Sequence, residues 1–161
     1  MNEREYQALI SEYTPVLYRV ARSILRSDQD CADAVQEAVF QGWIKRGQLR
    51  DKERFKPWIT RITVNECRNL QRRTARELNA LGVSIQEMQT RGDERQMQKQ
   101  KIDLDAALSE LPDKYSLPLV LHYVEDYPTK EIAGMLEIPE GRLRERMRTA
   151  RKLLGRLLGH E

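Results

Sequence analysis

The sequence has little of what several classes of protein require. Its two cysteines, Cys31 and Cys67, are too few for a disulfide framework and do not form a C-x-x-C pair. Its two histidines lie far apart in sequence, which leaves little for a zinc site. No apolar run approaches the roughly 20 residues that span a bilayer, and the charged N-terminal segment lacks the apolar core of a secretory signal. These absences predict a soluble, cytoplasmic protein without metal, cofactor or membrane insertion.

Strand signals are nearly absent as well, because we find no alternating run of β-branched residues with hairpin turns. Apolar residues instead recur at helical spacing along much of the chain. Hydrophobic residues make up 40% of the 161 residues, which is enough for a folded core. The sequence therefore predicts an all-α protein, and its length fits one ordinary domain or two small ones.

The charged residues are unevenly distributed, although the net charge is only +3. Residues 48–77 and 139–161 have an excess of basic side chains, and residues 78–138 between them have an excess of acidic ones. Because a solvated surface usually mixes its signs, two separate basic blocks suggest two contacts with a polyanion. The alternative is that both blocks are simply exposed helix faces.

The N-terminal half contains three predicted helices. Thr14 followed by Pro15 predicts a helix start, with an apolar stripe at helical spacing behind it. Ser27, followed by aspartates that suit the positive end of a helix dipole, predicts a second start. A third, longer helix is predicted to begin near Phe55. Residues 1–77 are therefore expected to form one all-helical domain.

The composition changes over residues 78–100, where glycines and a polar, charged run replace the apolar stripe. Such a segment buries little surface, which favours a flexible linker over an ordered arm. Residues 101–161 are expected to form a second small helical domain. Its last two helices, a short one and a longer arginine-rich one across a tight turn, have the layout of a helix-turn-helix. The predicted helices are 102–111, 115–124, 129–136 and 141–158, and Pro118 should fall in the first turn of the second or kink it.

No motif in the sequence indicates catalysis. We find no nucleophile elbow, phosphate-binding loop, metal-spaced histidine pair or deaminase signature. Asp28, Asp30 and Asp33 could suggest a metal-bound carboxylate cluster, but capping and the helix dipole explain them. His122 is interpreted as a helix residue with a satisfied ring, and both cysteines as small core hydrophobes. We therefore expect no enzymatic activity.

The C-terminal arginine-rich helix is a candidate for duplex recognition. Its apolar residues recur at spacings of four, three and four, so one stripe can pack against the preceding helices while polar residues project elsewhere. Arginine can bind guanine and glutamate can accept from cytosine in the major groove, and recognition helices insert by their N-terminal part. The alternative is a solvated amphipathic helix or a partner-binding surface. The candidate residues are Arg142, Arg144, Glu145, Arg148 and Thr149.

The helix in the middle of the chain offers a second contact. Five polar residues fall at spacings of three and four, so that they share a face; they are Asn65, Arg68, Asn69, Arg72 and Arg73. Arginines can neutralise phosphates, and asparagine can pair with an exposed base edge. Phe55 and Trp58 could stack on bases, although core packing is the better explanation for Trp58.

At this point the sequence resembles a family. The run YTPVLYRVARSILRSDQDCADAVQEAVFQGWIKRGQLRDKERFKPWITRITVNECRNLQRR is similar to region 2 of extracytoplasmic-function (group 4) sigma factors. The run LPDKYSLPLVLHYVEDYPTKEIAGMLEIPEGRLRERMRTARKLLGRLL is similar to their region 4, and together the two runs cover roughly two thirds of the chain. The resemblance is carried by D-x-x-Q-E at Asp33, Gln36 and Glu37, F-x-x-W at Phe55 and Trp58, and I-P-E-G at 138–141.

The resemblance implies a subunit that directs bacterial RNA polymerase to promoters. Its partners would be the polymerase core (β′ clamp helices and β flap), promoter DNA in single-stranded and duplex form, and an anti-sigma factor. Asp33, Gln36 and Glu37 match the surface that binds the clamp helices. The part that captures flipped bases of the minus-ten element is matched by residues 49–54 with Asn65, Arg68 and Asn69, and Arg72 and Arg73 extend that face. Region 4 would read the minus-thirty-five element through Arg142, Arg144, Glu145, Arg148 and Thr149.

Several residues depart from the family pattern. Glu137 stands where the turn usually has glycine, so a left-handed conformation there would be strained. Arg142, Glu145 and Thr149 replace a common threonine, serine and arginine, which bears on the sequence that is recognised rather than on docking. Two alternatives follow. One is a sigma-like interaction module that binds polymerase or a regulator without specifying promoters, and the other is a stand-alone helix-turn-helix repressor.

Overall fold

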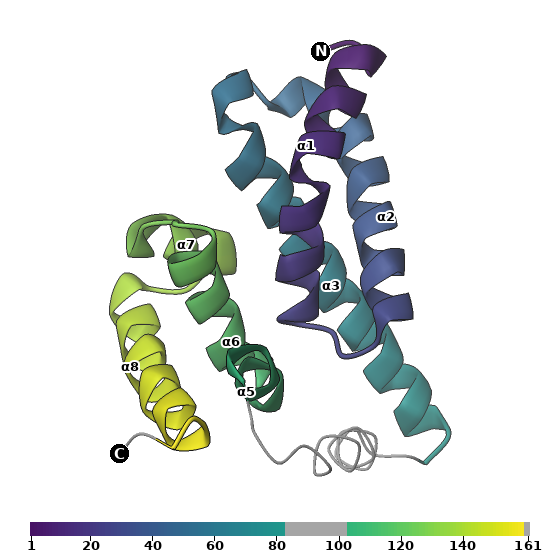
Figure 1. Ribbon diagram of the computed structural model, residues 1–161. Helices are drawn as coiled ribbons and strands as arrows, with labels where there is room; N and C mark the ends of the chain where they lie inside the picture. The colour runs from purple at the N-terminus through teal and green to yellow at the C-terminus, as the bar shows by residue number, and fades with distance from the viewer. Residues whose placement is uncertain (83–102, 160–161) are drawn as a thin grey trace. The chain divides into compact units, whose positions relative to one another are not determined.

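The computed structural model describes residues 1–82 and 103–159, and every regular element in these ranges is helical (Figure 1). This confirms the predicted all-α class. The chain divides into two compact units, Met1–Arg68 and Asn69–Glu161. Most of the expected linker, residues 83–100, lies outside the described residues, and so does His160.

Helix α1 (Glu3–Arg22) corrects the first predicted boundary, because it starts twelve residues before Pro15 and continues through it. Asn2 is the N-cap, and its side-chain oxygen accepts a hydrogen bond from the Glu5 amide at 2.8 Å. A proline inside a helix removes one backbone hydrogen bond. The helix nevertheless begins twelve residues before this proline, because Tyr6 is buried near the helix start, 4% exposed, and packs against Trp43 and Phe55. Tertiary packing therefore outweighs the local proline signal.

The second predicted helix start is confirmed. Helix α2 (Asp28–Ile44) begins after Ser27, whose hydroxyl oxygen accepts from the Asp30 amide at 3.0 Å. Two short 3-10 turns, η1 (Arg46–Gln48) and η2 (Lys52–Arg54), then lead into α3 (Phe55–Ala80). Helix α3 begins where the sequence predicts and ends three residues beyond 77. The division between the two units falls inside this one continuous helix.

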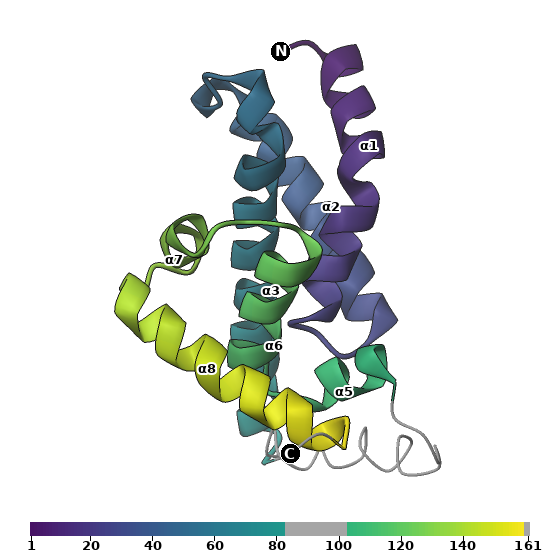
Figure 2. The same cartoon turned by 60° about the vertical axis from the view of Figure 1, so that its left-hand side comes forward.

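Helices α1 and α2 and the N-terminal part of α3 lie side by side in both views (Figures 1 and 2), and an aromatic cluster joins them. The Tyr6 ring lies 5.4 Å from Trp43 and 6.0 Å from Phe55 between ring centroids. Gly42 allows this close packing, because a Cβ there would lie 2.5 Å from the Tyr6 hydroxyl oxygen and 2.7 Å from Cδ1 of Ile59. Any other residue at this position would displace one of the two side chains.

The C-terminal unit consists of shorter elements. The helix predicted over 115–124 is present as two pieces, an α-helix from Asp113 that contains Pro118 and a π-helical turn directly after it. In that turn the Glu125 amide donates to the Val120 carbonyl at 3.0 Å. The prediction for 129–136 is confirmed at both ends. The elements are α5 (Leu104–Glu110), α6 (Asp113–Leu119), η3 (Val120–Val124), α7 (Thr129–Leu136) and α8 (Glu140–Leu157).

The turn between α7 and α8 has the strained geometry that the sequence predicts. Glu137 ends α7 in the left-handed region at φ 56° and ψ 43°. The Ile138 amide donates to the Ala133 carbonyl at 3.1 Å and the Glu137 amide to Gly134 at 3.4 Å, which are the two bonds of a Schellman motif. This turn fixes where α8 starts relative to α7. Helix α8 packs on α6 and α7 through residues that include Leu143, Met147 and Ala150.

Candidate nucleic-acid and polymerase interfaces

The polar residues predicted on the middle helix share one face of α3. Asn65, Asn69, Arg72 and Arg73 are exposed and Arg68 is half-buried. The structure brings two of them together, because Nη2 of Arg72 donates to Oδ1 of Asn69 at 2.6 Å. The opposite face is buried through Thr60, Thr63 and Cys67, each 0% exposed. The face is therefore held outward by packing, and its arginines and amides can contact phosphates and base edges.

The α2–α3 connection, residues 45–54, precedes this face. Its side chains from 50 to 54 are exposed and carry both signs of charge. Asp51 caps η2, since its Oδ1 accepts from the Glu53 amide at 3.0 Å. Phe55, which follows the connection, is 1% exposed, so its ring is not available to stack on a base. Trp58 is half-buried and lies 5.8 Å from Phe55 between centroids, as part of the aromatic cluster.

The three residues matched to polymerase binding, Asp33, Gln36 and Glu37, are all exposed on α2. The structure adds two apolar residues that our sequence analysis missed. Phe40 and Ile44 are each 56% exposed and continue the same stripe, because positions 33, 37, 40 and 44 are separated by four, three and four residues. This helical spacing could have identified both residues from the sequence. Exposed large apolar side chains beside polar ones are typical of a protein-binding surface.

The five residues predicted for duplex recognition are all exposed on α8, opposite the buried Leu143, Met147 and Ala150. Near the start of α8, Nη2 of Arg144 lies 2.9 Å from Oε1 of Glu140, one turn away. The same oxygen accepts from the Thr129 hydroxyl at 3.3 Å, so the beginnings of α7 and α8 are linked. Arg144 is thus directed along the helix rather than free in solution.

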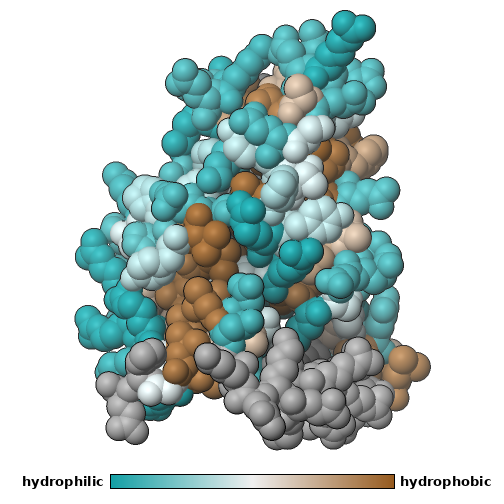
Figure 3. Space-filling view, viewed as in Figure 1, coloured by the Kyte–Doolittle hydropathy of each residue, from teal (hydrophilic) through white to brown (hydrophobic). Residues whose placement is uncertain are grey.

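The face shown in Figure 3 is mainly hydrophilic, with a hydrophobic strip over the C-terminal unit between α6 and α8. The strip agrees with leucines that are only partly buried around the small core of Leu111, Leu119 and Ala150. These are Leu108, Leu153, Leu154 and Leu157. They give this unit a partly exposed apolar surface.

The remaining chemical candidates have structural explanations. Burial raises the pKa of the Cys31 thiol to about 11 and that of Cys67 to about 12, so both are protonated and unreactive at neutral pH. Nδ1 of His122 lies 2.9 Å from the Tyr127 carbonyl oxygen, which satisfies the ring. Within the described residues no group of histidine, cysteine and acidic side chains could hold a metal ion. None of the helices described is long and apolar enough to cross a membrane.

Comparison with known proteins gives a consistent result. The family model for sigma-70 region 2 matches residues 9–77, and the model for sigma-70 region 4 matches residues 101–154. The sigma factor SigM of Mycobacterium tuberculosis, of the extracytoplasmic-function type, is 28% identical over 96% of this chain and 78% of its own length. SigV of Bacillus subtilis, an RNA polymerase sigma factor, is 26% identical over 90% of this chain and 86% of its own.

Two solved structures share the fold. The sigma factor RpoE of Bartonella quintana, in complex with the anti-sigma factor NepR, has a TM-score of 0.78 at 19% identity, over 97% of this chain and 98% of that one. CnrH, in complex with the cytosolic domain of CnrY, has a TM-score of 0.67 at 22% identity, over 98% of this chain and 90% of that one.

The fold and its exposed basic helices define a two-unit helical protein with a C-terminal helix-turn-helix. The two family models together match about three quarters of the chain, in the expected order. The chain belongs to the sigma-70 family and is an RNA polymerase sigma factor of the extracytoplasmic-function group.

Proposed function

We propose that this sigma factor specifies promoters through two separate DNA contacts while α2 holds the polymerase core. The domain division that goes with this is residues 1–77 for region 2, 78–100 for the linker and 101–161 for region 4. The single observation that carries the proposal is the exposure of two distinct cationic helix faces, one on α3 and one on α8, each backed by a buried apolar stripe.

The minus-ten contact consists of the α3 face and the α2–α3 connection. Unpaired bases expose their edges and their ring faces, so they require amides, arginines and a connection around which a base can turn. Asn65 and Asn69 supply amides, and Arg68, Arg72 and Arg73 neutralise phosphates. The Arg72 hydrogen bond uses one lone pair of Asn69 Oδ1, so the Nδ2 amide of Asn69 can donate to a base edge while the bond is kept.

The minus-thirty-five contact is the exposed face of α8. Arg142 and Arg144 lie in its first two turns, the part of a recognition helix that enters the major groove. Arg148 and Thr149 lie one turn further on the same side. Glu145 accepts from a cytosine amino group in the groove and repels phosphates elsewhere, which makes it a residue of specificity rather than affinity.

The polymerase contact consists of Asp33, Gln36 and Glu37 on α2, which face the β′ clamp helices, with Phe40 and Ile44 as apolar anchors on the same stripe. Region 4 contacts the β flap. An anti-sigma factor is a further partner, supported by the similarity to RpoE, whose structure was solved in complex with the anti-sigma factor NepR. The protein acts in the cytoplasm, where its polymerase is, and has no catalytic activity of its own.

Run-off transcription with core polymerase tests the proposal. With this chain added, core polymerase should initiate at defined start sites on genomic fragments, and mapping those sites gives the promoter elements. Tight core binding without template-specific initiation would instead favour the interaction module that does not specify promoters. Specific operator binding without polymerase would favour a repressor.

Substitution of Asn65 separates promoter opening from binding to the polymerase core. Asn65→Ala should lower promoter opening at least several-fold, because a base-edge contact is lost, and leave core binding unchanged. Asn79→Ala is the matched control, an exposed asparagine on the same helix about 21 Å further along. Opening can be followed by the permanganate reactivity of unpaired thymines. Equal loss of opening and of core binding would remove Asn65 from the capture site.

A further inference from the structure

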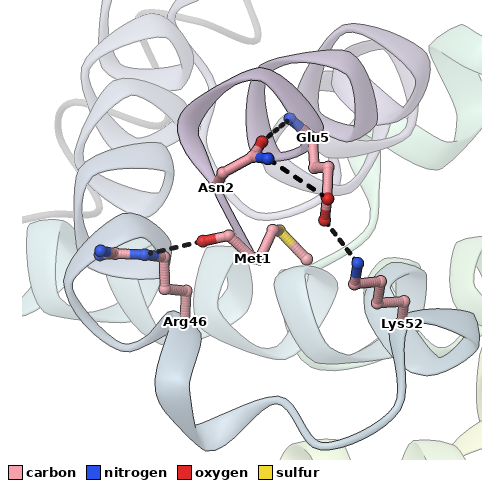
Figure 4. Close-up of polar contacts among 5 residues, drawn as sticks. All are labelled: Met1, Asn2, Glu5, Arg46 and Lys52. Carbon is pink, nitrogen blue, oxygen red and sulfur yellow. Dashed lines mark hydrogen bonds and ion pairs between the residues drawn. The ribbon is translucent and has the colours of Figure 1, made fainter.

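The segment Met1–Glu5, at the start of α1, contacts the α2–α3 connection at two places (Figure 4). At one end, Nε of Arg46 donates to the carbonyl oxygen of Met1 at 3.2 Å. At the other end, the Lys52 ammonium forms an ion pair with the Glu5 carboxylate. Each contact joins residues more than 40 positions apart in sequence. The segment between Arg46 and Lys52 is therefore held at both of its ends by the start of the chain.

The Arg46 side chain is held in place by Trp43. Its guanidinium lies 3.7 Å above the centroid of the Trp43 ring, and Nη1 donates to the Trp43 carbonyl at 2.8 Å. Trp43 in turn packs against Tyr6 of α1. Three interactions of one arginine, with a ring and two carbonyl oxygens, therefore connect the start of the connection to the aromatic cluster and to the beginning of α1.

The Glu5 contact is also oriented by a neighbour. The Glu5 amide donates to Oδ1 of the N-cap Asn2, and Nδ2 of Asn2 donates to Oε1 of Glu5 at 3.4 Å. This leaves Oε2 for Lys52. The hydrogen bond from Lys52 lowers the pKa of Glu5 below its usual value. The cap that starts α1 thus also directs Glu5 at the connection.

The connection needs such contacts because it has little internal structure. Its two 3-10 turns contain three residues each, and short 3-10 turns have weak hydrogen-bond geometry. The stretch between them is extended at Leu49 and Asp51, and most of its side chains are exposed. Its conformation is therefore set mainly by what holds its ends.

We propose that the N-terminal segment Met1–Glu5 is a positioning element for the α2–α3 connection, in which the Met1 carbonyl holds Arg46 and Glu5 holds Lys52. The inference rests on the proposed function, because it takes residues 49–54 as part of the minus-ten contact. A connection that is held before DNA arrives loses less conformational freedom when an unpaired base binds. Glu5 therefore acts on promoter opening through Lys52 without touching DNA.

The test compares Glu5→Gln with Glu3→Gln in the full chain. Both variants remove one negative charge from the first turn of α1, but the Glu3 carboxylate accepts from Gln7 on α1 itself. In Glu5→Gln, amide hydrogen exchange over residues 46–54 should become several-fold faster, and promoter opening by the reconstituted holoenzyme should fall about two- to fivefold, as the loss of an exposed ion pair predicts. Core binding and the exchange of α2 should stay as in the unchanged chain.

A second set of variants tests the route through Lys52. Lys52→Gln should give the same faster exchange, and adding Glu5→Gln to it should have little further effect, because the pair is already broken. Lys52→Arg keeps the pair and should retain the amide exchange of the unchanged chain over residues 46–54. Raising the salt concentration should bring the exchange of the unchanged chain toward that of Glu5→Gln, since salt screens an exposed pair.

The outcomes separate the positioning element from the proposed function. Unchanged exchange over 46–54 in both Glu5→Gln and Lys52→Gln would overturn the positioning element. A second result would also overturn it: Glu5→Gln exchanges faster over residues 46–54 but opens promoters as well as Glu3→Gln does, while Asn65→Ala still lowers opening. If neither Glu5→Gln nor Asn65→Ala alters opening although exchange is faster, the minus-ten contact itself is wrong, and the inference that rests on it falls too.

Discussion

The two proposed DNA-contacting surfaces are positioned in different ways. The N-terminal unit has the long helices α1 and α2, of 20 and 17 residues, the first part of α3, an aromatic core, and a connection held by contacts with Met1 and Glu5. The C-terminal unit has helices of seven or eight residues before α8, and its geometry comes from the backbone: a π-helical turn and two left-handed residues, Asp126 and Glu137. Side chains position the first surface, and backbone turns position the second.

This difference suits the two proposed targets. Unpaired bases can adopt many positions, so a site for them needs a connection whose shape is adjustable and is fixed by several side chains. The major groove of a duplex has a regular shape that admits one helix, so a single helix set at a fixed angle by a tight turn is sufficient. On each proposed surface one contact residue is already paired within the chain, Asn69 with Arg72 on α3 and Arg144 with Glu140 on α8. DNA binding exchanges one interaction for another at Arg144, whereas Asn69 can keep its bond to Arg72.

The largest expected effect tests whether the aromatic cluster holds the N-terminal unit. Phe55→Ala should lower the free energy of unfolding by about 3–5 kcal/mol, because it removes a fully buried ring and leaves a cavity. Phe40→Ala is the control of the same residue type, and as a 56% exposed side chain it should cost less than about 0.5 kcal/mol. Urea unfolding followed by circular dichroism measures both. Equal losses in the two variants would show that the cluster is not the source of stability.

A pair of helix glycines should respond with opposite signs in the two units. Gly42→Ala should destabilise by about 1–3 kcal/mol, because its Cβ would overlap Tyr6 and Ile59. Gly134→Ala should stabilise by about 0.5–1 kcal/mol, since nothing lies within 4 Å of the added Cβ and alanine favours a helix. Thermal or urea unfolding of each variant provides the values. The same sign in both would contradict the difference in packing described for α2 and α7.

Much of the helix pattern could be predicted from the sequence where the signals were local. Ser27 starts α2, residues 129–136 form α7, and Glu137 adopts the left-handed conformation inferred from its place in the turn. Each of these depends on a few neighbouring residues and on cap or turn chemistry. The exposed faces of α3 and α8 follow from helical spacing for the same reason.

The sequence does not predict the features that depend on contacts between residues far apart in the chain. Pro15 indicates a helix start, but burial of Tyr6 against residues more than 30 positions away extends α1 beyond it. The contacts of Arg46 with Met1 and of Lys52 with Glu5 join residues 45 and 47 positions apart, and no periodicity reveals such pairs. The α2 surface proposed to bind polymerase was predicted only in part. Its polar residues were identified from the sequence, but the exposed Phe40 and Ile44 on the same helix face were not.

An intermediate effect is expected for the duplex contact of the C-terminal unit. Arg144→Ala should reduce discrimination between promoter and altered duplex by about 1–3 kcal/mol, because arginine makes a paired contact with guanine. Arg156→Ala removes the same charge from the last turn of α8 and should leave discrimination unchanged. Competition binding with single-base variants of the minus-thirty-five element measures the difference. A uniform loss across all sequences would identify Arg144 as a phosphate contact.

The smallest expected effect concerns the backbone turn on which the C-terminal unit depends. A non-glycine residue at φ 56° carries a conformational cost of about 1–2 kcal/mol that glycine avoids. Glycine also makes the unfolded chain more flexible, which returns about half of that gain. Glu137→Gly should therefore stabilise by only about 0.5–1 kcal/mol, measured as a shift in the urea midpoint at constant slope.

Asp126→Gly provides the comparison for this turn, because Asp126 is also left-handed at φ 62° but aspartate tolerates that region better than glutamate. Its gain should be smaller than that of Glu137→Gly, or absent. If Glu137→Gly destabilised the protein, the interactions of the Glu137 side chain would outweigh its strain. The turn before α8 would then be positioned by a side chain, as the α2–α3 connection is, and the contrast between the two units would be lost at the point where it is sharpest.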